Sequence, residues 1–213
     1  GTFNGTTLTI SATPVDHALI PDEGATNVAG IAIVGSDMYC VKTTGLKTTL
    51  LKTTDYMATK ATAVKKDLNW FALGLTKIGN YLYMLAEDHK GYGGSTTIVK
   101  LDTKGNQLGT YSINEICPKG ALGITAADGT NEKFIIMHYA DKSNAGTLAF
   151  SVVDWKAAEA ASTFTVTNSG FGYTTRLQDI YYHTSFGLFI LTNNTFSTLQ
   201  NRILVVDYHL TDD

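Results

Sequence analysis

Charged residues are scarce in this sequence. Asp, Glu, Lys and Arg together make up 16% of the 213 residues, and the net charge is −3, whereas about 25% charged residues is usual for globular domains. Proteins that bind nucleic acid generally carry a basic patch, so we predict no nucleic-acid partner. No apolar run approaches the roughly 18 residues that a membrane-spanning helix needs, and we therefore predict no insertion into a membrane.

Cysteine and proline are also rare, with two and three residues. Cys40 and Cys117 do not belong to a Cys-x-x-Cys pair, which leaves the chain without a zinc or thiol-redox motif. No glycine-rich loop leads from a strand into a helix to hold phosphate, and no serine has the spacing of a nucleophile elbow. The sequence therefore indicates no cofactor, no metal site and no catalytic residue.

Glycine and tyrosine, in contrast, are abundant, with 20 and 11 residues, and together with frequent threonine they favour strands and turns. A small residue followed by an apolar one recurs at Gly30, Gly74 and Gly123, and Asp179 takes the same place in a fourth copy, in steps of 44, 49 and 56 residues. Each copy continues with a short turn, two further apolar runs and, in the first three copies, a more polar fourth run.

Four short strands per copy and a period near 50 residues are typical of a β-propeller blade. We therefore predict a single all-β domain, a small propeller of about four four-stranded antiparallel blades, with a β-sandwich or five blades as alternatives. The last copy lacks a fourth run, so we expect an N-terminal strand at residues 6–12 to pair with it and close the ring. The expected blades are residues 29–68, 71–117, 121–168 and 176–210.

This order of strands resembles that of β-propeller proteins in general. The segment 97–105, Thr-Ile-Val-Lys-Leu-Asp-Thr-Lys-Gly, is similar to the third strand and turn of many sugar-binding, NHL-like and lactonase-like propellers. No WD dipeptide, kelch glycine pair or sialidase Asp-box is present. The resemblance therefore implies the architecture and transfers no family's catalytic residues.

In a propeller, the loops between strands two and three and between strand four and the next strand one lie at the same end of the ring. Here these loops are long, polar and interspersed with aromatic residues, a mixture that suits sugars or polar peptides. Gly, Asn and Asp also form turns without any ligand, and Asp179 near the axis can equally accept bonds from backbone amides. The candidate ligand-binding residues are Trp70, Asp88, His89, Tyr92, Asp141, Tyr173, Arg176, Asp179 and Asn193.

We therefore predict a non-enzymatic binding module that recognises a glycan or a protein through its long-loop face. The sequons at Asn4 and Asn193 favour an extracellular or cell-surface location, and the start at Gly1-Thr2 resembles that of an excised domain. One alternative is a structural domain of a larger surface or fibre assembly. The other is a propeller hydrolase or lyase acting on a sugar or lactone, with carboxylates drawn from Asp22, Glu23, Asp67, Glu87, Asp88, Asp141 and Asp179.

Overall fold

The structure of the chain is a computed structural model. It describes residues 2–3, 8–9, 27–54, 61–88, 95–118, 120–127, 131–140, 147–157, 159–167, 175–194 and 202–210. Every regular element in these residues is a β-strand. The described part of the chain contains no helix of the length and apolarity that crossing a membrane requires.

The strands form four antiparallel sheets, which we number as blades in chain order. Blade 1 consists of β3 (Asn27–Val34), β4 (Asp37–Thr44), β5 (Lys47–Thr53) and β6 (Thr62–Leu68), and blade 2 of β7 (Phe71–Ile78), β8 (Tyr81–Glu87), β9 (Thr96–Leu101) and β10 (Gln107–Ser112). Blade 3 consists of β11 (Ala121–Ala126), β12 (Lys133–Tyr139), β13 (Thr147–Asp154) and β14 (Ser162–Thr167), and blade 4 of β15 (Thr175–His183), β16 (Gly187–Asn194) and β17 (Arg202–Val206).

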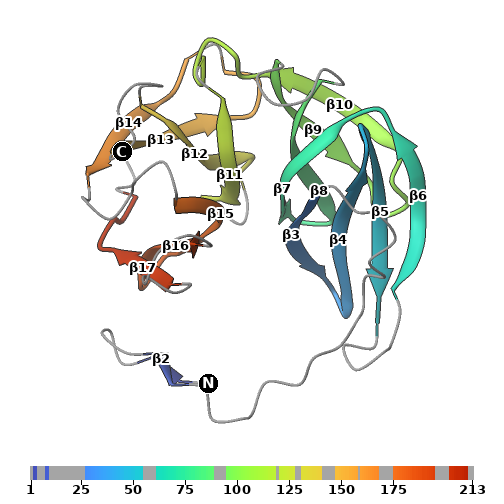
Figure 1. Cartoon of the computed structure of the whole chain (residues 1–213), viewed down its shortest axis with the longest axis horizontal. Helices are drawn as coiled ribbons and strands as arrows, with labels where there is room; N and C mark the ends of the chain where they lie inside the picture. Colours follow the sequence, from blue (N-terminus) through green and yellow to red (C-terminus); the bar gives the residue numbers. More distant parts are fainter. Residues whose placement is uncertain are drawn as a thin grey trace.

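The four blades stand around a common axis, with their first strands, β3, β7, β11 and β15, innermost (Figure 1). The predicted all-β propeller of four antiparallel blades is therefore confirmed. Two-residue turns join β3 to β4 and β7 to β8, and their glycines, Gly35 and Gly79, have φ angles of +62° and +57°. Hairpin turns of this kind require such angles, which glycine adopts without strain.

The hydrophobic core is divided among the interfaces between successive blades. One cluster lies between blades 1 and 2, a second between blades 2 and 3, and a third between blades 3 and 4. Each blade contributes alternate residues to the interfaces on its two sides, because successive side chains of a strand point to opposite faces. The second interface includes an aromatic group in which Trp155 meets Tyr83, Tyr111 and Phe134 edge to face.

Glycines on the inner strands bring neighbouring blades into close contact. A Cβ atom added to Gly30 would lie 2.1 Å from the backbone nitrogen of Leu75 in blade 2, and one added to Gly74 or Gly123 would lie 3.4 Å from that of Ile124 or Ile180. Each inner strand also has a β-bulge at or directly before this position, and bulges bend and twist a strand. The repeated glycine thus marks where one blade is seated on the next.

The N-terminal segment does not close the ring in the way that we expected. Leu8–Thr9 (β2) pairs with Thr2–Phe3 (β1), and in the part of the chain that the structure describes neither strand pairs with β17. A short hairpin closes a much smaller loop than a pairing between the two ends of the chain, and it therefore costs less conformational entropy. The other residues of the expected strand, 6, 7 and 10–12, lie outside the described residues.

Candidate functional site

The fourth interface, between blades 4 and 1, is not packed like the other three. The residue that follows the inner-strand glycine position is buried at each closed interface, with Leu75 2%, Ile124 1% and Ile180 5% exposed. Its counterpart in blade 1, Ile31, is 64% exposed, and Ile33 on the same strand is 49% exposed. We call this fourth contact the open interface; it is lined by Ile31, Ile33, Asp179, Tyr181, Phe189, Ile203 and Val205.

Two changes in blade 4 explain why the open interface does not close. Asp179 stands where the other blades have glycine. By comparison with Gly30, Gly74 and Gly123, where an added Cβ atom would lie 2.1–3.4 Å from a backbone nitrogen of the next blade, we infer that its Cβ atom keeps the backbone at Ile31 from approaching. Thr76 and Thr125 each accept a hydrogen bond of 3.1 Å from a backbone N–H of the next blade. The corresponding residue of blade 4 is Tyr181, whose larger side chain is 60% exposed. Blade 4 thus lacks the glycine that all three closed interfaces have and the threonine that two of them have.

The face of blade 4 at the open interface is apolar and partly aromatic. Tyr181, Phe189 and Val205 are opposite one another across its three strands and therefore form a row on one face. The rings of Tyr181 and Phe189 are 6.3 Å apart, and Val205 is 44% exposed. Ile203, two residues before Val205, lies on the same face and is 50% exposed. Exposed apolar surfaces of this kind mark sites of interaction.

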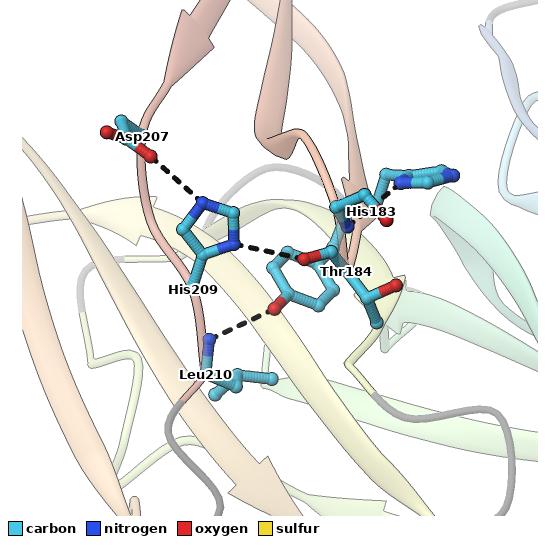
Figure 2. A network of polar contacts seen from close by, with 7 residues as sticks. His183, Thr184, Asp207, His209 and Leu210 are labelled. Atoms are coloured by element: carbon cyan, nitrogen blue, oxygen red, sulfur yellow. Dashed lines mark hydrogen bonds and ion pairs between the residues drawn. The ribbon is translucent and has the colours of Figure 1, made fainter.

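The C-terminal segment after β17 lies on the other side of blade 4. Figure 2 shows His209 between Asp207 and Thr184: its Nε2 atom is 2.9 Å from the Asp207 carboxylate and its Nδ1 atom is 3.0 Å from the Thr184 carbonyl oxygen. The backbone N–H of Leu210 donates to the Tyr182 hydroxyl group. The ring of Tyr208 stacks on Phe164 of blade 3, so this segment covers the interface with blade 3 and leaves the open interface uncovered.

Asp179 lies where the open interface meets the axis. Its Oδ1 atom would be 3.8 Å from a Cβ atom on Gly74, and it accepts a hydrogen bond of 2.9 Å from the backbone N–H of Ile180. Burial raises the pKa of Asp179 to about 7, although the bond from Ile180 acts in the opposite direction. Because Ile180 is its only donor among the described residues, this poorly solvated carboxyl group can accept a hydrogen bond from a ligand hydroxyl group or bind a cation.

The candidate residues outside blade 4 that the structure describes interact with neighbouring residues of their own or the adjacent blade. The indole N–H of Trp70 donates to the Gln107 side chain over 3.2 Å, and the ring packs against the cluster between blades 1 and 2. Asp88 follows directly after β8, and its backbone N–H bonds to the carbonyl oxygen of Ser95. Glu87 is buried, whereas Asp67 is exposed and lies 4.0 Å from Lys47. The structure does not bring these carboxylates together with Asp179.

Arg176 and Asn193 are cross-strand partners on β15 and β16, in the half of blade 4 that also contains Asp179. Among the described residues, no group of three or more His, Cys, Asp and Glu side chains is placed to hold a metal ion. The remaining candidates, His89, Tyr92, Asp141 and Tyr173, lie outside the described residues, as do Asp22 and Glu23.

The open interface was missed by the sequence analysis, although three signals of it are present in the sequence. Asp179 interrupts the series of inner-strand glycines, the fourth copy has three runs instead of four, and Tyr181 and Phe189 occupy strand positions that alternate with buried ones. Taken together, these signals indicate one blade that differs from the rest on a single face.

No known family profile and no curated protein matches this sequence. Among solved structures, the chain is similar to hydrazine synthase of Kuenenia stuttgartiensis, with 12% identity, coverage of 82% of this chain and 49% of that one, and a TM-score of 0.49. It is also similar to glutaminyl cyclase of Myxococcus xanthus, with 13% identity, coverage of 84% and 74%, and a TM-score of 0.49. YCF48, in a structure bound to D1 peptide, has 12% identity, coverage of 88% and 55%, and a TM-score of 0.43.

The chain thus spans about half the length of the hydrazine synthase chain. Sequence identities of 12–13% and TM-scores below 0.5 carry no information about a substrate or partner. The function has to be inferred from the chain itself.

Proposed function

We propose that this propeller is a non-enzymatic binding module whose ligand is a protein, held at the open interface. The observation that carries the proposal is the exposure of Ile31 and Tyr181, 64% and 60%, at positions where the other blades pack against each other. Leaving one large apolar side chain in water instead of burying it costs about 1.5–3 kcal/mol, so a partner that covers both gains substantial free energy.

The chemistry of the site also favours a polypeptide over a free sugar. Aliphatic residues from blade 1 face an aromatic and aliphatic row on blade 4, and Asp179 supplies one acceptor at the inner end. Protein interfaces typically combine an apolar centre with a few polar groups at its margin. A glycan would require more hydrogen-bonding side chains than Asp179 and Tyr181, the two polar ones among the described residues that line the open interface. The long loops that our sequence analysis assigned to ligand binding lie mainly outside the described residues.

Arrays of peptides and of glycans, probed with the purified chain, test this proposal. We expect hits among the peptides, and we expect Ile31→Ser and Tyr181→Ser to weaken them at least tenfold. Leu46→Ser and Leu108→Ser are matched controls, because these residues are 46% and 52% exposed but lie away from the open interface. Hits confined to glycans, or hits that the two interface variants leave unchanged, would show that the proposal is wrong.

A second candidate function rests on Asp179 alone. A carboxyl group with a pKa of about 7 is suited to act as a general acid or base near neutral pH, which favours the hydrolase or lyase alternative for a sugar or lactone. Turnover of aryl glycosides or of simple lactones, lost in Asp179→Asn, would support this alternative. Turnover that Asp179→Asn retains would exclude Asp179 as its catalytic residue.

A further inference from the structure

We propose that the ligand at the open interface is an extended segment of a partner protein, which adds to β17 as the fourth strand of blade 4. This inference rests on the proposed function and specifies the conformation of the bound segment. The partner segment alternates apolar and polar side chains, as β14 does, because one of its faces meets the open interface and the other faces away from it.

Within the described residues, blade 4 has three strands, whereas blades 1–3 each have four. In the complete blades, the third strand lies between the second and the fourth and its apolar residues are almost fully buried. Leu50, Ile98 and Phe150 are each 0% exposed. The third strand of blade 4 is β17, and among the described strands it pairs with β16 alone. Its residues Ile203 and Val205 are 50% and 44% exposed.

The outer edges of the other blades are polar. The exposed residues of the fourth strands β6, β10 and β14 are mainly lysine, threonine, serine and glutamine. Polar and charged edge strands keep a sheet from pairing with other chains. The sequence of β17 after its first residue is Ile-Leu-Val-Val, with no charge or proline to prevent pairing. An edge strand of this composition is suited to being covered.

The occupant has to be extended because the edge offers backbone N–H and C=O groups in a row. Peptides that add to a sheet edge gain affinity from main-chain hydrogen bonds and specificity from alternate side chains. The described N-terminal strands β1 and β2 pair with each other, and residues 207–210 pack towards blade 3. Among the segments that the structure describes, neither of these two occupies the edge of β17, and we assign the place to a partner protein.

Amide hydrogen exchange on the intact chain tests the inference, with a synthetic peptide of the β14 sequence Ser-Thr-Phe-Thr-Val-Thr as probe. This sequence is the fourth strand of blade 3, where it pairs with the third strand β13 in regular register. We expect millimolar peptide to slow exchange at the outward amides of residues 203–206 at least tenfold. The same peptide with proline in place of its central threonine is the control, because it lacks one backbone donor and cannot extend the ladder.

Protein variants give a second readout. Ile203→Lys and Val205→Lys should abolish the slowing, whereas Leu108→Lys on the edge of β10 should leave it intact. The outward amides of β17 could already exchange slowly without peptide, to the same extent at every protein concentration. This result would mean that the chain covers its own edge, and it would overturn the inference. Protection that grows with protein concentration would mean that a second copy is the occupant, and would overturn it as well.

The inference and the proposed function fail in different ways. A peptide that binds in a manner sensitive to Ile31→Ser but leaves exchange in β17 unchanged would refute strand addition and leave the binding function standing. Exchange in β17 that remains fast at millimolar peptide, with no binding detected, would likewise refute strand addition. Peptide hits that do not respond to any variant of the open interface would refute the proposed function itself.

Discussion

At the scale of the residue, blade 4 differs from the other blades in the carboxyl group of Asp179, which stands where they have glycine. Asp179 keeps its proton up to about pH 7 in the folded chain, because burial disfavours the charged form, whereas its ordinary pKa is 3.8. Between these two pH values the folded chain binds more protons than the unfolded chain. The free energy of unfolding therefore falls as the pH rises from about 4 to 7 and is constant above this range with respect to this group.

The substitution Asp179→Asn tests this statement. We expect the variant to be more stable than the wild type at pH 8, by about 1–2 kcal/mol after allowance for partial solvation of the carboxylate. Near pH 4 the two should differ little. Urea denaturation between pH 4 and 8 measures the difference, with Asp154→Asn as control, since this residue is half exposed and only 3.9 Å from Lys133. Parallel stability curves for wild type and Asp179→Asn would contradict the raised pKa.

Asp102 provides a contrasting case in a turn. Its carboxylate accepts hydrogen bonds of 2.8 Å from the backbone N–H groups of Lys104 and Asn106 and from the Asn106 side chain. Although burial acts in the opposite direction, these bonds lower the pKa of Asp102. We expect Asp102→Ala to reduce the free energy of unfolding at pH 7 by about 1 kcal/mol. Because the stabilisation requires the carboxylate, the loss should disappear as the pH falls below the pKa of the folded state, which urea denaturation at low pH measures.

The inner strands and their glycines determine the architecture at the scale of the element. Gly30 and Gly79 both have φ angles near +60°, but a Cβ atom on Gly30 would collide with the backbone of Leu75, whereas one on Gly79 would meet nothing within 4 Å. We expect Gly79→Ala to cost about 1 kcal/mol from backbone strain alone. Gly30→Ala should cost several kcal/mol more, measured by thermal or urea unfolding. Equal costs would show that the contact with Leu75 is not structurally important.

How far the sequence predicts the structure also differs from element to element. The inner strands with their glycines and the hairpin turns at Gly35 and Gly79 could be predicted from the sequence, because strand periodicity and turn chemistry depend on neighbouring residues. The pairing of Leu8–Thr9 with Thr2–Phe3 was not, since two short strands of similar pattern can pair with several edges. The open interface was also missed, because exposure of Ile31 depends on what the distant residue Asp179 permits. Among the candidate site residues whose side chains the structure describes, Asp179 lies at this interface, and its position near the axis was predicted from its place in the repeat.

At the scale of the whole molecule, the ring of blades is interrupted at the open interface. Removal of the Cβ atom at position 179 should allow blades 4 and 1 to pack against each other there. In Asp179→Gly the backbone at Ile31 gains the space that Leu75 has beside Gly30. The variant Ile31→Cys places a thiol at the open interface as a reporter. When Asp179→Gly is added to it, we expect labelling of the thiol at position 31 to slow at least tenfold. Asp179→Asn, which also removes the charge but retains Cβ, should leave labelling fast. Equal labelling in both variants would show that Cβ does not keep the ring open.

Two cysteines that play no part in the proposed chemistry give the molecule an internal pair of probes. Cys40 is opposite Ile31 on the face of blade 1 at the open interface, whereas Cys117 belongs to the cluster between blades 2 and 3. Both thiols are buried and unpaired, and burial raises the pKa of Cys40 to about 11 and of Cys117 to about 12. Each therefore reacts with a disulfide reagent chiefly when its surroundings open transiently. The unmodified protein thus reports, in one measurement, how often the incomplete part of its ring opens relative to the complete part.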